Sequence, residues 1–207
     1  MNAVTATEVL PLSLPPQHQN SRRQHIAGLS LSEAAIEQYN GILHAVNEDA
    51  PKVEVDQVIS LGRWLQALPQ ETAEATLHER IARVEGLRRL LHDSDWNPSP
   101  EFDKRARELI DYIGRVDDLI PDDIPLVGHL DDALLVELSW PALAGEARDY
   151  ADYCRFRAEA KPRGTPNERR LAWESVCMAE VVRLRQQREI RQRGYARPQP
   201  LTNLRVV

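Results

Sequence analysis

Apolar residues recur at intervals of three or four positions along most of the chain, the spacing that collects them on one face of an α-helix. The pattern predicts six or seven helical segments, over residues 29–46, 55–68, 72–93, 99–116, 131–140, 146–160 and 165–193. No segment alternates as a strand or a β-hairpin does, and the sequence holds no internal repeat. We therefore predict an all-α fold, a single helical domain with a turn rich in proline and aspartate between its fourth and fifth helices.

Several of the predicted helices begin with residues that can cap the free amides of a first turn. Three starts carry such a signal: Ser30 with Glu33, Ser99 with Pro100, and Thr165 with Glu168. A proline inside a helix removes one backbone hydrogen bond and clashes with the preceding turn. We therefore expect Trp140-Pro141 to interrupt the chain between the fifth and sixth segments.

The two ends of the chain differ from the helical body. Three prolines break the apolar run of residues 9–16, and the N-terminal residues lack the basic and apolar regions of a signal peptide. We expect residues 1–28 to form a disordered lead-in, residues 29–160 the helical domain, and residues 161–207 a linker, a basic helix and a tail. No segment holds the ~18 uncharged apolar residues that a bilayer-spanning helix requires.

Residues 118–132, DLIPDDIPLVGHLDD, hold the most distinctive sequence. Pro121 and Pro125 bar a regular helix and push the residues before them toward extended backbone, while Gly128 offers a position free to take positive φ. Six of the other residues are apolar, namely Leu119, Ile120, Ile124, Leu126, Val127 and Leu130, so we expect an irregular turn that places apolar side chains in the helical core. Its buried amides need acceptors, which aspartates can provide to amides two or three residues further on or at the start of the next helix.

This stretch resembles the signature of the YkvA-like family, a domain of unknown function with a D-L-I-P-D-x-I-P-x-x-G-x-x-D-D core between two helices. Ten positions match: Asp118, Leu119, Ile120, Pro121, Asp122, Ile124, Pro125, Gly128, Asp131 and Asp132. The resemblance covers about residues 105–145, a fifth of the chain. It implies a small helical module, in proteins often described as membrane-associated, with no settled activity.

Two features depart from that family pattern. Family members usually place Ser-Pro-Ile before the first aspartate, where this chain has Arg115-Val116-Asp117, and Glu137 and Pro141 interrupt the apolar helix that follows. The apolar stretch from Ala133 to Ala144 has 12 residues. It is therefore shorter than the ~17 residues of a minimal spanning helix. We expect a cytoplasmic protein that is at most peripheral to a membrane.

Charge separates the body of the chain from its end. Residues 155–207 hold 13 Lys and Arg against 5 Asp and Glu, whereas residues 1–154 hold 13 against 27. The imbalance indicates an anionic partner, an unknown protein or a membrane surface, and the candidate contacts are Arg183, Arg185, Arg188, Arg191, Arg193 and Arg197. A solvated helix end, with cations near its C-terminal dipole, is the alternative. Nucleic acid stays open, although only Tyr195 lies among the arginines and a base-stacking platform is missing.

The aspartates also admit a second hypothesis, a divalent-metal-dependent hydrolase. Asp118, Asp122, Asp131 and Asp132, with His129 nearby, could gather ligands for Mg²⁺ or Mn²⁺ and so activate a water. Their spacing does not match an EF-hand loop, and capping or local hydrogen bonds explain the same residues without a metal. The sequence therefore favours a non-catalytic interaction or membrane-peripheral module over this alternative.

No other chemistry is indicated. Cys154 and Cys177 have the spacing of neither a zinc site nor a disulfide framework, and we expect partly buried thiols. The sequence lacks the metalloprotease, phosphate-loop and nucleophile-elbow motifs, so we predict no cofactor and no small-molecule site is evident. Catalytic residues stay unknown, because a nucleophile set assembles only in the fold and spacing alone nominates none. The tryptophans are expected in the core or at its rim; they are Trp64, Trp96, Trp140 and Trp173.

Overall fold

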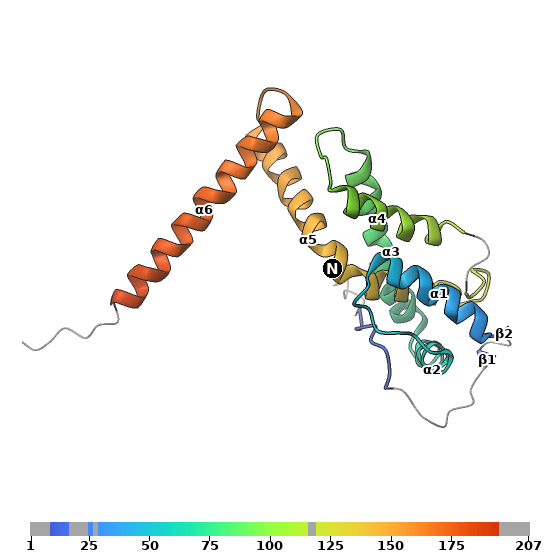
Figure 1. The fold of residues 1–207 in the computed structure, drawn as a ribbon. Helices are drawn as coiled ribbons and strands as arrows, with labels where there is room; N and C mark the ends of the chain where they lie inside the picture. The colour runs from blue at the N-terminus through green and yellow to red at the C-terminus, as the bar shows by residue number, and fades with distance from the viewer. Residues whose placement is uncertain (1–8, 17–24, 27–28, 116–118, 195–207) are drawn as a thin grey trace, which may run out of the picture. The chain divides into compact units, whose positions relative to one another are not determined.

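A computed structural model describes residues 9–16, 25–26, 29–115 and 119–194 (Figure 1). Its helices are α1 (Glu33–Val46), α2 (Val55–Gln66), α3 (Gln70–His92), α4 (Pro100–Ile113), α5 (Leu130–Ala160) and α6 (Pro166–Gly194). Within the described ranges the only strands, β1 (His25–Ile26) and β2 (Leu29–Ser30), pair antiparallel. The predicted all-α class is confirmed, and the expectation of no β pairing fails only at these two short strands.

The chain divides into two compact units, Met1–Asp152 and Tyr153–Val207. The first unit holds α1 to α4 and the greater part of α5, and the second holds the end of α5 and α6. The predicted domain boundary lies between Ala160 and Lys161, at the end of α5. None of the helices in the described part of the chain is both long and apolar enough to cross a lipid bilayer.

The core of the first unit forms around the start of α5. The α1 stripe expected from the sequence is buried, and it consists of Ile36, Tyr39, Leu43 and Val46. Four consecutive α5 residues, Ala133 to Val136, are also buried, so this part of the helix is covered on every side. Side chains of α1, α4 and α3 form hydrogen bonds with the first residues of α5, so these three helices pack around its start (Figure 1).

Two of the three predicted helix caps are confirmed. The Ser99 hydroxyl accepts a 3.2 Å hydrogen bond from the Phe102 amide at the start of α4. At the start of α6, the Glu168 carboxylate accepts a 2.7 Å hydrogen bond from the Thr165 amide. The cap predicted at Ser30 is wrong: Ser30 lies in β2, where its backbone is extended, and Ser32 caps α1 instead.

The predicted interruption at Pro141 is wrong, because α5 continues through it from Leu130 to Ala160. An internal proline costs a helix about 3 kcal/mol or more. Contacts with other elements offset this cost. The side-chain amide of Asn47 donates a 2.8 Å hydrogen bond to the Leu138 carbonyl, just before the proline, and Leu143 is fully buried just after it.

Glu137, which interrupts the apolar run of α5, joins a charged cluster with α3. Its carboxylate accepts hydrogen bonds from Arg80 at 3.1 Å and from Arg83 at 3.2 Å. Arg80 is only 4% exposed, and Arg83 also stacks over the Trp140 ring at 5.2 Å. The cluster therefore connects α3 to the turn of α5 that contains Pro141.

The predicted disorder of residues 1–28 is wrong for residues 9–16. Leu12 is buried, and the Leu10 amide donates a 3.2 Å hydrogen bond to the Thr76 hydroxyl in α3. The Gln57 side chain in α2 donates a 2.7 Å bond to the Pro15 carbonyl. Residues 9–16 belong to no helix or strand, so their backbone groups remain available to side chains of the helices. Residues 1–8, 17–24 and 27–28 lie outside the described residues.

Candidate functional site

The segment between α4 and α5 is built from consecutive turns over residues 119–129. Backbone hydrogen bonds of 3.1 Å from Ile124 to Pro121 and 2.9 Å from Gly128 to Ile124 close two of them. Leu119, Ile120 and Val127 are buried. The segment therefore contributes apolar side chains to the core while its backbone remains irregular, and its amides need acceptors from outside regular structure.

Position 128 requires glycine because there is no room for a side chain. The positive φ expected at this position is not observed. Within this segment it is Leu126 that takes the left-handed conformation, with φ of 67°. A Cβ atom on Gly128 would lie 2.5 Å from the Asp122 carbonyl oxygen, closer than real Cβ contacts allow. The backbone at Gly128 and the backbone at Asp122 thus approach so closely that only glycine fits at position 128.

A buried carboxylate, that of Asp131 at the start of α5, holds this segment in place. Its Oδ2 atom accepts hydrogen bonds from the Tyr112 hydroxyl at 2.9 Å, the Leu119 amide at 3.0 Å and the Ile120 amide at 3.2 Å. Its backbone carbonyl accepts a 3.1 Å bond from the Tyr39 hydroxyl. Asp131 is fully buried, so these bonds join α1, α4, the turn segment and α5 at one residue.

The two tyrosines lie edge to face, with ring centroids 5.8 Å apart. Burial raises the pKa of the Tyr39 hydroxyl well above its usual value, and the charge of Asp131 adds to the effect. Burial likewise raises the pKa of Tyr112, and the charge of Asp131 and its hydrogen bond raise it further. Both hydroxyls therefore stay protonated as donors at neutral pH and cannot serve as general bases there.

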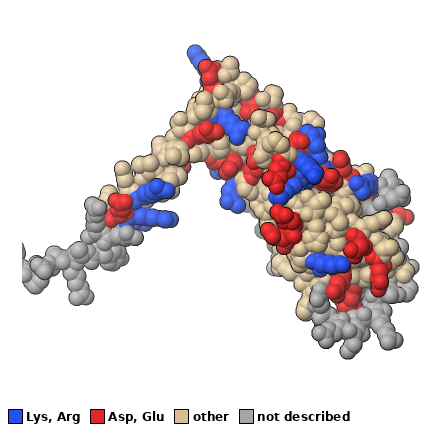
Figure 2. Space-filling model, viewed as in Figure 1, with Lys and Arg blue, Asp and Glu red and all other residues tan. Residues whose placement is uncertain are grey.

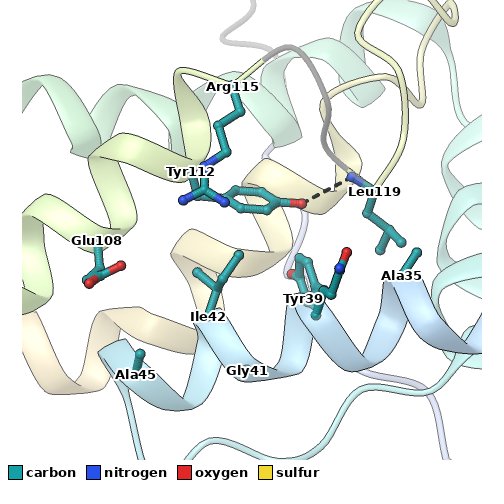
Figure 3. Close-up of a pocket in the computed structure, with 10 residues that line it drawn as sticks. Ala35, Tyr39, Gly41, Ile42, Ala45, Glu108, Tyr112, Arg115 and Leu119 are labelled. Atoms are coloured by element: carbon teal, nitrogen blue, oxygen red, sulfur yellow. Dashed lines mark hydrogen bonds between the residues drawn. The ribbon is translucent and has the colours of Figure 1, made fainter.

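An open pocket of about 440 Å³ lies between α1 and α4 beside these tyrosines (Figure 3). Its lining includes Ala35, Ile42, Tyr39, Tyr112, Glu108 and Arg115. The tyrosine hydroxyls already donate to Asp131, so Glu108 and Arg115 are the charged groups among the lining residues. The sequence reasoning missed this pocket, because it depends on how two separate helices pack.

Asp122, His129 and Asp132 come together at the end of the turn segment. His129 Nδ1 lies 2.8 Å from Asp122 Oδ1 and 3.7 Å from Asp132 Oδ2. One ligand atom of each residue lies within 4.8 Å of the others, a spacing that could hold a metal ion. Asp122 and His129 are about half exposed, and Asp132 is buried. From the sequence alone, His129 is identified only as a residue near the aspartates.

The structure thus separates the four aspartates that the sequence proposed as metal ligands. Asp131 faces the core and binds Tyr112 and two amides, which is a structural role. Asp122 and Asp132 converge on His129. Asp118 lies outside the described residues. Pro121 and Pro125 are exposed, so these prolines shape the turn without entering the core.

The arginine-rich end of the chain falls on α6. Arg183 forms an ion pair with Glu180 at 3.2 Å. Arg185, Arg188 and Arg191 are exposed and form no ion pair within the described residues. Arg197 and the side chain of Arg193 lie outside them. In the view of Figure 2, Lys and Arg side chains project near the C-terminal end of α6.

The α6 helix also exposes large apolar side chains. Seven are 43–69% exposed, namely Leu171, Val176, Met178, Val181, Val182, Leu184 and Ile190. Trp173 is the exception, since it is buried and packs edge to face on Tyr153 at the end of α5, with centroids 5.9 Å apart. One side of α6 is therefore anchored, and the others are open to solvent.

Comparison with known proteins gave no match among protein-family models, and no significant match among curated proteins or solved structures. The resemblance to the YkvA-like family therefore stays a prediction, carried by the ten matching positions within residues 118–132.

Proposed function

We propose that this chain is a non-catalytic interaction protein and that α6 is the helix through which it binds an anionic partner surface. The supporting observation is the distribution of exposed apolar side chains. Of the eight large ones that are exposed among the described residues, seven lie on α6, and the eighth is Val9. Such a concentration on one helix is typical of a surface that a partner covers.

Apolar and cationic groups on α6 would act together. Burying one large apolar side chain contributes about 1.5–3 kcal/mol, so a few of them suffice for a stable contact. The exposed guanidinium groups of Arg183, Arg188 and Arg191 would attract carboxylates or phosphates and speed association. The partner that fits both features is a surface with apolar patches and negative charge, either anionic lipid or an acidic protein face.

Binding to anionic probes tests this proposal. Full-length protein is mixed with phosphatidylserine vesicles, with phosphatidylcholine vesicles and with polyglutamate, across a salt series. We expect salt-sensitive binding to at least one anionic probe and none to the neutral vesicles, since phosphate and carboxylate contacts weaken as salt screens them. Binding to vesicles would identify a protein peripheral to a membrane, and binding to polyglutamate alone an acidic protein partner.

A matched pair of variants assigns any binding to α6. The triple variant Arg183→Gln, Arg188→Gln, Arg191→Gln should lose it. The control Arg63→Gln, Arg107→Gln, Arg115→Gln removes the same charge from exposed positions of the first unit and should keep it. Equal loss in both variants, or no binding to any anionic probe at low salt, would refute the proposal.

A divalent-metal-dependent hydrolase is the second candidate, and the convergence of Asp122, His129 and Asp132 is the observation that favours it. One imidazole and two carboxylates suit Mn²⁺ or Zn²⁺ better than Mg²⁺. The test is calorimetric titration with MnCl₂ and ZnCl₂, together with thermal unfolding. Heat and a raised Tm in the wild type that vanish in His129→Gln would support this candidate. Their absence in the wild type would eliminate it.

A further inference from the structure

We infer that α6 is also a self-association surface, on which α6 of a second copy of this chain packs antiparallel. The surface is a stripe formed by Leu171, Ser175, Met178 and Val182, and we call it the α6 stripe. It goes beyond the proposed function, because the stripe takes only three of the seven exposed apolar side chains. The other four, Val176, Val181, Leu184 and Ile190, lie off the stripe, as do Arg183, Arg188 and Arg191, and they remain for the anionic partner. Either proposal can therefore fail without the other.

Helix geometry places the stripe opposite the buried side of α6. At 100° per residue, the four stripe positions fall within an arc of about 60°, and Trp173 lies on the far side. Leu171, Met178 and Val182 are 53%, 66% and 50% exposed. Trp173, by contrast, is covered by Tyr153. The stripe is thus the side that remains for a partner once α6 is anchored.

The stripe follows the spacing of a coiled-coil seam. Glu168, Leu171, Ser175, Met178, Val182 and Arg185 are separated by alternating steps of three and four residues. The Ser175 hydroxyl donates a 2.8 Å hydrogen bond to the Leu171 carbonyl of its own helix. This polar group would therefore keep its hydrogen bond when a partner covers it, and the stripe can be buried without an unsatisfied donor.

The same seam is complementary to itself when two helices run in opposite directions. In an antiparallel pair, the numbers of two residues that face each other add up to the same value at every contact. One register pairs every residue of the seam with another residue of the seam. It places Leu171 against Val182, Ser175 against Met178, and Glu168 against Arg185 of the second copy. Each contact occurs twice, as two-fold symmetry requires. The alanines at positions 172 and 179 flank the seam and leave room for a close approach.

Charge selects the antiparallel direction over the parallel one. Residues 183–194 hold five Arg and one Glu, whereas residues 166–180 hold two Arg and three Glu. A parallel pair would place the two strongly cationic ends side by side. In the antiparallel register given above, Arg188 and Arg191 extend past the start of the partner's α6 and Arg185 faces Glu168, so the two cationic ends are kept apart.

Sedimentation velocity of the full chain across a concentration series tests the inference. We expect the wild type to form a dimer, and Met178→Glu to raise the dimer dissociation constant by about tenfold or more, since a carboxylate in the seam costs its hydration. Ile190→Glu is the matched control, because Ile190 is 69% exposed but lies off the stripe. It should dimerise as the wild type does, and circular dichroism checks that both variants keep their helices.

Disulfide trapping tests the direction and the register. In a background with Cys154 and Cys177 changed to Ser, proteins carrying Leu171→Cys or Val182→Cys are mixed and oxidised. The mixed disulfide should form in preference to either symmetric one. A dominant symmetric Leu171→Cys disulfide would overturn the antiparallel register. A monomeric wild type, or a dimer that Met178→Glu leaves intact, would overturn the inference, while retained binding to the anionic probes would leave the proposed function standing.

Discussion

The Tyr112 hydroxyl in α4 donates a 2.9 Å hydrogen bond to the Asp131 carboxylate in α5, and the same carboxylate oxygen accepts the amides of Leu119 and Ile120. The irregular segment between the two helices is therefore tied at both of its ends. Its prolines exclude a regular helix, and a carboxylate at the start of the following helix satisfies two of the amides exposed by that irregularity.

Removing the Asp131 carboxylate should destabilise the first unit strongly. Asp131→Ala should lower the free energy of unfolding by about 3–5 kcal/mol, because three buried donors lose their acceptor at a typical cost of 1–3 kcal/mol each. Asp131→Asn keeps one oxygen and should cost less. Urea unfolding measures both. Asp123→Asn, at an exposed position of the same turn, is the control and should change stability by less than about 0.5 kcal/mol.

The tyrosines at this site predict a loss of stability in alkali. The folded-state pKa of both Tyr39 and Tyr112 is raised above the unfolded value of about 10. Their contribution is fully present below pH ~10 and is lost as pH rises further, by about 1.4 kcal/mol per pH unit for each hydroxyl. In Tyr112→Phe the fall above pH ~10 should be shallower. An unchanged slope would show that this hydroxyl does not titrate on unfolding.

Two glycine-to-alanine substitutions should have opposite effects. Gly128→Ala places a Cβ atom 2.5 Å from the Asp122 carbonyl oxygen and should cost about 2–3 kcal/mol as the turn is forced apart. Gly145→Ala meets no atom within 4 Å and lies inside α5, where alanine favours the helix by about 0.5–1 kcal/mol. Thermal unfolding should therefore show a lowered Tm for the first and a raised Tm for the second. A tolerated Gly128→Ala would mean that the turn can open.

The charged cluster between α3 and α5 should matter more than a surface ion pair of the same chemistry. Glu137→Gln weakens the pairing with Arg80, whose side chain is only 5% exposed, and should cost about 2–3 kcal/mol. Arg80 keeps its 2.8 Å bond to the Thr76 carbonyl, which limits the loss. Glu85→Gln, which removes the exposed pair with Arg88, should cost about 0–1 kcal/mol in the same urea measurement.

Features that depend on residues close together in the chain were predictable. Ser99 and Thr165 take part in caps where the sequence placed them, since a cap is formed by groups three residues apart. The apolar stripe of α1 is buried for the same reason. The continuous helix through Pro141 was not predictable, because it is supported by a hydrogen bond from Asn47, which is far away in the sequence.

The site was predictable only as a set of candidates. The spacing of the aspartates in residues 118–132 could not show which of them would lie close enough together to bind a metal. In the fold, Asp131 contacts Tyr112 whereas Asp122 contacts His129. We expected Asp131 to stabilise the first turn of the helix that follows, yet its carboxylate accepts hydrogen bonds from amides 11 and 12 residues before it. Such a contact depends on how α4 and α5 pack, which no local pattern contains.

Tyr112 and Tyr39 both reach Asp131, but from very different distances along the chain. Tyr112 is 19 residues from it and Tyr39 is 92. The chain is synthesised from its N-terminus, so α1 emerges long before the residue that binds Tyr39 exists. At about 5–20 residues per second the delay is roughly 5–20 s. During this time the apolar face of α1 has no native partner on α5, and such transiently exposed apolar surface makes a folding chain prone to aggregate.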